Sequence, residues 1–402
     1  MDIIVQKYGG TSVGNIEKIK NVADKIIKTK NTGKSLIVVL SAMSGETNRL
    51  LGLAHQISKH PSDREMDMLV STGEQVSTSL LAIALHEKGY GAISLNAHQV
   101  GIYTDKAFTK ARITEIKSDK LIKHLNDDKI IIVTGFQGVD TEGNITTLGR
   151  GGSDTSAVAV AAAIKAEKCE IYTDVDGVYT TDPRIVKNAK KLKYITYDEM
   201  LELASLGAKV LMNRSVEFAK KFKVKLEVKS SYEDIEGTLI VEDNTKMENV
   251  VISGITQKKD EAKVTIHKVP DNTGVASKIF KQIGDKNINV NVIVQTSSVN
   301  DVTDISFTIP RINIEDVKNI LENLKSDIKY KNYYIADDIS IVSMVGIGMK
   351  SHAGIASSAF DILAKNEINI DMISTSEIKI SVIVKEKDSE KSVQVLHEYF
   401  IK

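Results

Sequence analysis

The chain has 402 residues, which at roughly 150 residues per domain predicts two or three domains. Its 53 Lys and Arg residues balance its 53 Asp and Glu residues, so there is no net field to attract a polyanion, which argues against nucleic acid or a membrane surface as a partner. The single cysteine, Cys169, excludes an internal disulfide framework and a zinc site built from several thiolates. Together with an N-terminal segment that lacks the pattern of a signal peptide, it predicts a cytoplasmic protein.

The first part of the chain, from Met1 to about Ile240, alternates β-branched runs with helical stretches. This alternation predicts an α/β domain around a largely parallel sheet that is buried on both faces. The expected strands are residues 2–7, 35–41, 92–95, 129–134, 170–173 and 225–228, and the expected helices are residues 16–29, 65–87 and 154–166.

The second part of the chain contains an internal repeat. GVASKIFKQIGDKNINVNVI begins at Gly274, and GIASSAFDILAKNEINIDMI begins 80 residues later at Gly354. Each copy reads as strand, glycine-started helix, strand, strand and helix, which is a split βαβ module. The second copy ends at Lys402 without a last strand, so we expect the apolar run at 250–256 to cross over and complete its sheet.

Two glycine-rich loops precede expected helices, and the first of them directly follows an expected strand. KYGGTS places Lys7 beside two glycines and two hydroxyl groups, a composition that suits phosphate because backbone N–H groups can approach an anion there. LGRGGSDTSA places Arg150 among three glycines, where its planar guanidinium can bind a carboxylate or a phosphate. A third loop, YTDVDGVYTTDPR, lies at the carboxyl edge of the sheet and lacks the ligand spacing of a calcium loop.

Seven motifs occur in order along the chain: KYGGTS, SAMSGETN, STGEQVS, GFQG, GRGGSDTSA, TDVDGVYTTDPR and GAKVL. Together they resemble the aspartate kinases of the amino-acid-kinase fold, and the 80-residue repeat is similar to the paired ACT modules of the same enzymes. The resemblance implies a mainly parallel sheet sandwiched by helices in residues 1–241. It implies a regulatory region at 250–402 with two ferredoxin-like βαββαβ ACT modules, at about 260–337 and at 338–402 completed by strand 250–256.

The activity that the resemblance implies is the phosphorylation of the side-chain carboxylate of L-aspartate by ATP and Mg²⁺. The product is 4-phospho-L-aspartate, which begins the biosynthesis of lysine, threonine and methionine. The reaction needs no catalytic base, because a side chain with a reference pKa of about 3.9 is already ionised at neutral pH. Phosphoryl transfer depends mainly on positioning and on neutralisation of charge.

The resemblance also assigns roles residue by residue. The residues that carry the reaction are Lys7, Asp154 and Arg150. The residues that bind the phosphates and the nucleotide are Lys7, Gly9, Gly10, Ser12, Thr173, Asp174, Tyr179, Asp182, Arg184 and Lys209. The residues that bind aspartate are Thr47, Glu74, Arg150, Gly152 and Ser153, with Glu74 facing the ammonium group and Arg150 the α-carboxylate. No residue is assigned as a resident metal ligand.

The ACT modules imply regulation by lysine, threonine or both, and a homodimer or higher oligomer formed through these modules. The effector residues are Asp271, Gly274, Ala276, Asn289, Gln295, Asn369 and Ile370. Two positions depart from the family pattern: Met212-Asn213 replaces His-Pro after GAKVL, and Thr273 replaces a common proline. Two alternative functions stay open, a kinase for another carboxylate such as glutamate and a catalytically silent subunit that senses an amino acid.

Overall fold

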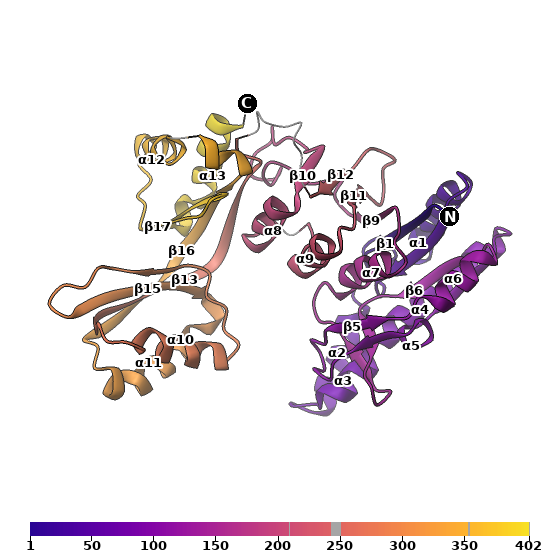
Figure 1. Ribbon diagram of the computed structural model, residues 1–402, viewed down its shortest axis with the longest axis horizontal. Coiled ribbons are helices and arrows are strands. Elements are labelled where there is room, and N and C mark those ends of the chain that lie inside the picture. Colours follow the sequence, from indigo (N-terminus) through magenta and orange to yellow (C-terminus); the bar gives the residue numbers. More distant parts are fainter. Residues whose placement is uncertain (209, 243–250, 353, 402) are drawn as a thin grey trace. The chain divides into compact units, whose positions relative to one another are not determined.

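The computed structural model describes residues 1–208, 210–242, 251–352 and 354–401 (Figure 1). The chain divides into two compact units. The first unit contains Met1–Val178, Lys191–Ala204 and Lys209–Lys246, and the second contains Tyr179–Lys190, Ser205–Ala208 and Met247–Lys402. The second unit therefore includes a short segment, Tyr179–Lys190, from near the middle of the chain.

An eight-stranded sheet forms the centre of the first unit, with the strand order β10-β12-β11-β9-β1-β2-β6-β3. All neighbouring strands are parallel except β11 and β12, so the predicted mainly parallel sheet is confirmed. The strands are β1 (Ile3–Tyr8), β2 (Ser35–Leu40), β3 (Ala92–Leu95), β6 (Ile130–Thr134), β9 (Lys168–Thr173), β10 (Tyr194–Thr196), β11 (Leu226–Ser230) and β12 (Thr238–Val241).

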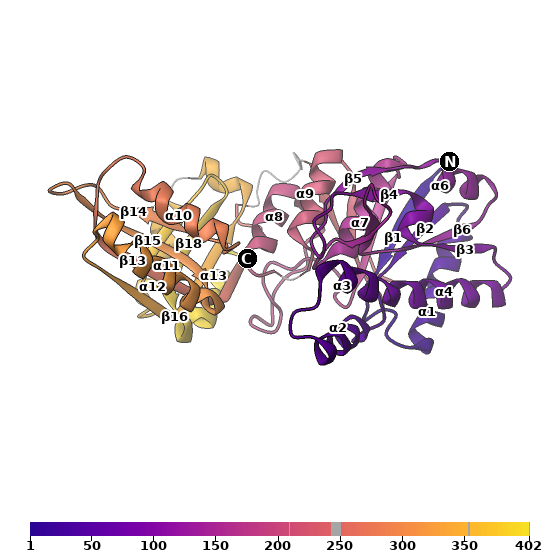
Figure 2. The same cartoon turned by 90° about the horizontal axis from the view of Figure 1, so that it is seen from below.

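Helices cover both faces of this sheet (Figure 2). On one face, α1 (Ile16–Lys30) and α4 (Thr72–Glu87) bury apolar residues such as Ile26 and Leu85 against the strands. On the other face lies α7 (Gly152–Ala163), whose small side chains are buried over most of its length, and α9 (Asn213–Phe222) packs against α7. The remaining helices of the first half are α2 (Glu46–Ile57), α3 (Asp63–Val70), α5 (Ala97–Val100), α6 (Asp119–Asn126) and α8 (Tyr197–Ser205).

The expected single helix at residues 65–87 is wrong, because the chain breaks at Ser71 into α3 and α4. The Ser71 hydroxyl donates to Met68 O, and its carbonyl oxygen accepts from Gln137 Nε2 at 3.0 Å. Ser71 itself keeps helical φ and ψ values of −63° and −15°, and its N–H donates to Asp67 O at 3.1 Å, so the break is a single residue long. By length and composition alone Asp63–Glu87 could cross a membrane, but half of its apolar window is buried in the fold, which is the pattern of a core helix.

A smaller sheet with the order β5-β4-β7-β8 lies beyond the end of β6. Its strands are β4 (Ile102–Thr104), β5 (Ile113–Ile116), β7 (Gln137–Val139) and β8 (Ile145–Thr147). Strand β8 leads directly into the glycine loop that precedes α7. The position of that loop therefore depends on this small sheet as well as on α7.

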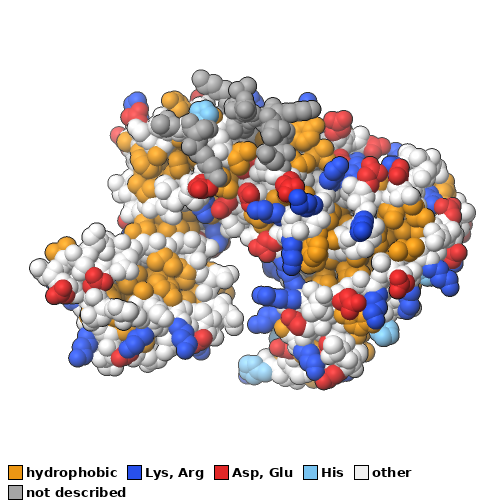
Figure 3. Space-filling view, viewed as in Figure 1, with side chains coloured by type: hydrophobic (Ala, Val, Ile, Leu, Met, Phe, Trp, Pro, Cys, Tyr) orange, Lys and Arg blue, Asp and Glu red, His pale blue; other side chains and the backbone are white. Residues whose placement is uncertain are grey.

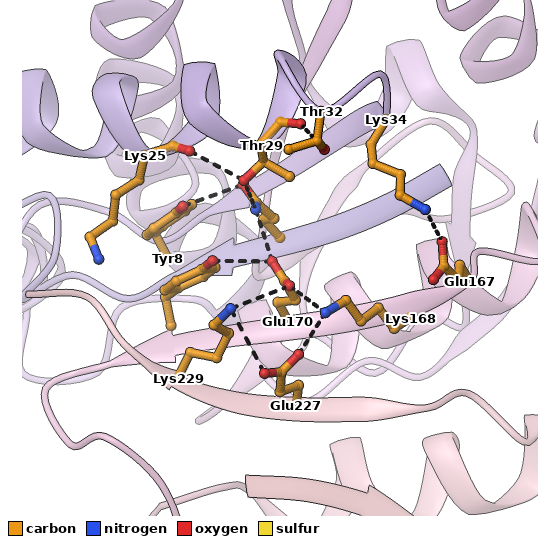
Figure 4. A network of polar contacts seen from close by, with 12 residues as sticks. Tyr8, Lys25, Thr29, Thr32, Lys34, Glu167, Lys168, Glu170, Glu227 and Lys229 are labelled. Carbon is orange, nitrogen blue, oxygen red and sulfur yellow. Dashed lines mark hydrogen bonds and ion pairs between the residues drawn. The ribbon is translucent and has the colours of Figure 1, made fainter. Parts of the chain in front are cut away.

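A polar network lies on the α1 side of the main sheet, across β1, β9 and β11 (Figure 4). Gln6 Nε2 donates to Glu170 Oε2 at 2.8 Å, and Lys168 forms ion pairs with Glu170 at 2.8 Å and with Glu227 at 2.7 Å. Burial raises the pKa of Glu170, but the hydrogen bond from Lys168 and the charge of Lys229 outweigh it and hold this pKa below its ordinary value. The network ties β11 to β1 and β9, the two strands whose ends carry predicted phosphate-binding and nucleotide-binding residues.

A single six-stranded antiparallel sheet runs through the second unit, in the order β14-β15-β13-β16-β18-β17. Its strands are β13 (Gly254–Pro270), β14 (Ile293–Gln295), β15 (Val302–Pro310), β16 (Asn332–Val345), β17 (Met372–Thr375) and β18 (Lys379–Lys385). Its helices are α10 (Val275–Asp285), α11 (Ile314–Ile328), α12 (Ile355–Lys365) and α13 (Ser389–Phe400), with short 3-10 turns at Arg311–Asn313, Ile347–Ser351 and Glu386–Asp388. This antiparallel region after the parallel sheet agrees with the predicted fold class.

The two repeat copies share the long strands β13 and β16. The beginning of β13 pairs with the end of β16, which also pairs with β18 in the second copy. The later part of β13 pairs with β15 in the first copy. The expected crossover strand at 250–256 overlaps the start of β13: Val250 lies outside the described residues, the strand begins at Gly254, and it continues into the first copy without ending.

Each copy has its own apolar core. Helices α10 and α11 cover the first copy, where Ile279 and Leu321 pack with Val264 and Phe307 (Figure 1). Helices α12 and α13 cover the second copy. The segment Tyr179–Lys190 joins the second core through Val186, and Ile255 N–H donates to Thr180 O at 2.7 Å.

Candidate active site

The end of β1 places Lys7 on the face of the sheet that α7 covers. Lys7 Nζ lies 2.6 Å from Asp154 Oδ1, and each side chain is 11% exposed. Asp154 lies in the first turn of α7, where the helix dipole favours a carboxylate. Two residues that are 147 positions apart in sequence thus form a nearly buried ion pair, as a lysine that stabilises a phosphoryl group requires.

The predicted phosphate loop follows Lys7 directly. Ser12 N–H donates to Gly9 O at 2.9 Å, which closes a tight turn. A Cβ atom at Gly10 would lie 2.8 Å from Ala42 O, so only glycine lets this turn approach the loop after β2. The Ser12 hydroxyl is buried and shares a 2.6 Å hydrogen bond with the hydroxyl of Ser231, which follows β11 at the same edge of the sheet.

Glu74 lies in the first turn of α4 and is 3% exposed. Its Oε1 accepts a hydrogen bond from Ala42 N–H at 3.0 Å, while its Oε2 is buried without a hydrogen-bond partner among the described residues. Burial raises the pKa of Glu74 to about 7. Thr47 lies in the first turn of α2, just after the same loop, and is half-buried. A buried carboxylate with one unsatisfied oxygen is well suited to accept a cationic group of a ligand.

Arg150 lies in the glycine loop between β8 and α7, and its side chain is exposed. The loop is tightly constrained at its end: Gly151 has a φ of 72°, and a Cβ atom there would lie 1.9 Å from Met212 Cγ. Gly152 and Ser153 begin α7, and Ser153 is buried next to Gly135 of the GFQG motif. The loop therefore holds an exposed cationic side chain on a backbone of restricted conformation.

The predicted nucleotide residues are divided between the two units. Thr173 and Asp174 end β9 in the first unit, where Thr173 Oγ1 donates to Asp174 Oδ1 at 3.1 Å. Lys209 lies outside the described residues. Tyr179, Asp182 and Arg184 belong to the second unit. There Arg184 Nε donates to Asp182 Oδ1 at 3.0 Å, and the hydrogen bond from Arg184 lowers the pKa of Asp182.

The predicted effector residues lie at the two opposite ends of the six-stranded sheet. Asp271, Gly274 and Ala276 surround the start of α10, and Gln295 ends the edge strand β14. Asn289 lies between them and is exposed. Asn369 and Ile370 precede β17, which is the other edge strand. One copy of the chain therefore does not bring the two groups of residues together.

Sequence reasoning missed the partners that hold the site residues in place. Ala42 contributes only its backbone N–H to Glu74, so no side-chain pattern marks it. Ser231 could have been predicted, because it follows the expected strand at 225–228 and so lies at the carboxyl edge of the sheet, where the other site residues also lie.

Comparisons with known proteins bear on both halves of the chain. A family model described as the amino acid kinase family matches residues 2–230, and one described as the ACT domain matches residues 267–324 and 342–400. The chain is 53% identical over 401 residues to aspartate kinase of Pseudomonas putida, covering 100% of this chain and 98% of that protein. It is 49% identical over 400 residues to aspartokinase 2 of Bacillus subtilis, with the same coverage.

Solved structures give the same result. The crystal structure of E. coli aspartokinase III with aspartate and ADP, in the R-state, aligns with a TM-score of 0.83 at 27% identity over 100% of both chains. The T-state structure of that enzyme with lysine and aspartate aligns with a TM-score of 0.80, also at 27% identity over 100% of both chains. The family predicted from the seven motifs is confirmed. The chain belongs to the aspartate kinases, a branch of the amino acid kinase family that carries ACT domains.

Proposed function

We propose that the protein transfers the γ-phosphoryl group of ATP to the side-chain carboxylate of L-aspartate, as the first step of lysine, threonine and methionine biosynthesis. E. coli aspartokinase III binds aspartate and ADP, the substrate and the spent nucleotide of this reaction. Within the first unit, Lys7 and Asp154 would meet the transferred phosphoryl group, while Glu74, Arg150, Thr47 and the start of α7 would hold aspartate. The proposal includes a cytosolic location, which the single buried thiol of Cys169 permits.

The observation that carries this proposal is the state of Glu74. A buried carboxylate whose Oε2 lacks a partner among the described residues is costly unless a cation binds there. The ammonium group of an amino acid is such a cation, and the exposed Arg150 provides the opposite charge for an α-carboxylate. An amino acid whose ammonium group and α-carboxylate are both bound has its side-chain carboxylate free to react.

The reaction follows from charge and position. The aspartate side chain is already ionised at neutral pH, so it attacks phosphorus without losing a proton. Lys7 stabilises the negative charge on the transferred group, and Asp154 keeps the Lys7 ammonium in place. Among the described residues no cluster of three or more His, Cys, Asp or Glu side chains could hold a metal ion. The Mg²⁺ of the reaction would therefore arrive with ATP, bound mainly by its phosphates, and neutralise part of their charge.

A comparison of three acceptors tests this assignment: L-aspartate, L-glutamate and succinate, which lacks the ammonium group. We expect ADP release with aspartate, and a value of kcat/KM lower by about a hundredfold or more with succinate, because Glu74 is then left buried without a cation. Glutamate, with one more methylene, should fall by about 10-fold to 100-fold. Equal rates with succinate would remove Glu74 from ammonium recognition, and a preference for glutamate would change the substrate.

The proposal extends to regulation by lysine, threonine or both at the ACT modules, since E. coli aspartokinase III binds lysine in its T-state. The two groups of predicted effector residues lie at opposite sheet edges in one copy. The edge strands β14 and β17 carry exposed apolar residues, with Ile293 53% and Ile373 42% exposed. Exposed edges of this kind favour pairing with another copy, and a homodimer would bring the two groups together.

The segment Tyr179–Lys190 offers a route from the effector region to the nucleotide. It carries Asp182 and Arg184, yet its Val186 is part of the core of the second ACT module. In addition, Thr180 Oγ1 is hydrogen-bonded to His397 Nε2 of α13 at 2.8 Å. A change in the packing of this module would thus shift Asp182 and Arg184, the residues predicted to bind the nucleotide. Allosteric coupling requires contacts of this kind, which differ between two states of the protein.

The variant Gln295→Ala is expected to weaken inhibition by lysine or threonine about tenfold, because Gln295 is a neutral polar contact at the proposed effector site. Turnover without effector should stay largely intact, since Gln295 ends edge strand β14 of the first copy, whereas the segment with the nucleotide residues packs on the second copy. The measurement is the effector concentration for half-maximal inhibition, with the exposed Gln282 of α10 changed to alanine as a matched control. Lost activity with unchanged sensitivity would contradict the assignment of Gln295.

A further inference from the structure

Two chain segments form the support of the Arg150 loop. One is the loop at residues 107–111, and the other is the end of β8. They are joined by a hydrogen bond from Ala111 N–H to Thr147 O at 2.9 Å. A Cβ atom at Gly149 would lie 3.0 Å from Thr109 O, so the 107–111 loop lies directly against the beginning of the Arg150 loop.

Asp67 of α3 accepts hydrogen bonds from backbone N–H groups of both segments. Its carboxylate is fully buried, and Oδ2 accepts hydrogen bonds from Thr109 N–H and Thr147 N–H, each at 2.8 Å. Its Oδ1 accepts from Thr147 Oγ1 at 2.6 Å. One carboxylate thus satisfies three donors and connects α3 to both segments.

Arg214 of α9 donates hydrogen bonds to backbone carbonyl groups of the same two segments. Its guanidinium donates to Leu148 O at 2.8 Å and to Ala111 O at 2.7 Å. The residue two positions earlier, Met212, packs against Gly151 at the other end of the loop. Asp67 therefore binds backbone N–H groups, and Arg214 binds backbone carbonyl groups, of the two segments that support the Arg150 loop.

We propose that Asp67 and Arg214 are positioning residues for aspartate: they fix the two segments from which the Arg150 loop starts, and so set where the Arg150 guanidinium meets the substrate α-carboxylate. This inference rests on the proposed function. Arg150 lies between Gly149 and Gly151, whose φ values are 75° and 72°, and a Cβ atom at either glycine would meet Thr109 O or Met212, so the position of the Arg150 backbone depends on the packing around the loop. A shift of about 1 Å in a substrate-positioning group can cost on the order of a hundredfold in rate.

The experiment compares Arg214→Ala and Asp67→Ala with the conservative variants Arg214→Lys and Asp67→Asn. In Asp67→Asn the amide oxygen can accept from both backbone N–H groups while the amide nitrogen donates to the Thr147 hydroxyl. We expect each alanine variant to raise KM for aspartate about tenfold or more and to change KM for ATP less than about twofold, because the proposed ligand of Arg150 is the α-carboxylate of the amino acid. The conservative variants should restore KM for aspartate to within about threefold of the wild-type value.

Arg64→Ala is the matched control, because Arg64 lies on the same helix as Asp67 and its contacts are with Glu65 and Asn144. Thermal unfolding of every variant separates positioning from loss of fold, and Arg214→Gln replaces Arg214→Ala if the latter does not fold. An unchanged KM for aspartate in a folded alanine variant would overturn the inference, as would equal increases in KM for aspartate and for ATP. If the wild-type protein shows no aspartate-dependent turnover, the proposed function itself fails.

Discussion

Replacement of Lys7 by alanine is expected to lower kcat by about a hundredfold or more, because it removes a nearly buried cation that we propose stabilises the transferred phosphoryl group. The Lys7 ammonium acts in a site of low exposure, where one positive charge stabilises the transition state far more than it would in water. The measurement is kcat for ADP release at saturating Mg-ATP and aspartate.

Lys34→Ala is a suitable control, since Lys34 pairs with Asp2 and Glu167 at the opposite edge of the same sheet and should leave kcat unchanged. Lys7→Ala leaves the Asp154 carboxylate without its partner, which destabilises the fold by about 3 to 5 kcal/mol in comparable buried pairs. The double variant Lys7→Met, Asp154→Asn removes both charges and should recover much of the stability without recovering kcat. A kcat near the wild-type value in either variant would exclude Lys7 from the mechanism.

The variant Glu74→Gln is expected to make the protein more stable and a much poorer aspartate kinase. Burial raises the pKa of Glu74 to about 7 from its ordinary value of 4.5. The folded state therefore binds a proton that the unfolded state has lost, and this carboxyl group contributes less to stability as the pH rises from about 4.5 to 7. Glutamine keeps the acceptor for Ala42 N–H without the charge, so at pH 8 the free energy of unfolding should rise by about 1 to 2 kcal/mol.

The same substitution should lower kcat/KM for aspartate about a hundredfold or more, because the substrate ammonium loses its carboxylate partner. In the wild-type protein, kcat/KM for aspartate should fall about tenfold per pH unit below pH 7, since protonated Glu74 must lose its proton before it pairs with the ammonium group. This fall should be absent in Glu74→Gln. Thermal unfolding at pH 5 and pH 8, with pH profiles of kcat/KM, measures both effects. Stabilisation that is equal at both pH values, or an unchanged profile, would contradict this role of Glu74.

The sequence was sufficient to predict the mainly parallel sheet and the ordered motifs at its carboxyl edge. Parallel strands buried on both faces leave long apolar runs, and motifs such as KYGGTS, SAMSGETN and GFQG follow such a run. The family resemblance, rather than the topology, put Lys7 and Asp154 together among the residues that carry the reaction, and the structure shows them as an ion pair.

Other features depend on tertiary contacts that leave no local pattern. Asp67 and Arg214 act through backbone groups of distant segments, so nothing in their neighbourhoods marks them. Strand β13 continues through the polar stretch QKKDEAK because register shifts near Glu261 absorb the irregularity, whereas the expected crossover strand ended at residue 256. The alternation of apolar residues describes which face of a strand is buried, but it does not describe where the strand ends.

The distribution of charged side chains on the surface agrees with the net charge of zero in the composition. On the face shown in Figure 3, basic and acidic side chains are interspersed over the surface. A small anionic substrate must then be attracted by local groups such as Lys7 and Arg150 rather than by a general field.

The measurement that tests the central claim most directly is the trapping of the acyl phosphate product with hydroxylamine, after incubation of the protein with Mg-ATP and L-aspartate, alone and with lysine, threonine or both. The account predicts aspartyl hydroxamate in step with ADP release, and less of both when lysine, threonine or the pair is present. Absence of hydroxamate with aspartate, together with stabilisation of the protein by an amino acid, would contradict it and would point to a catalytically silent sensor.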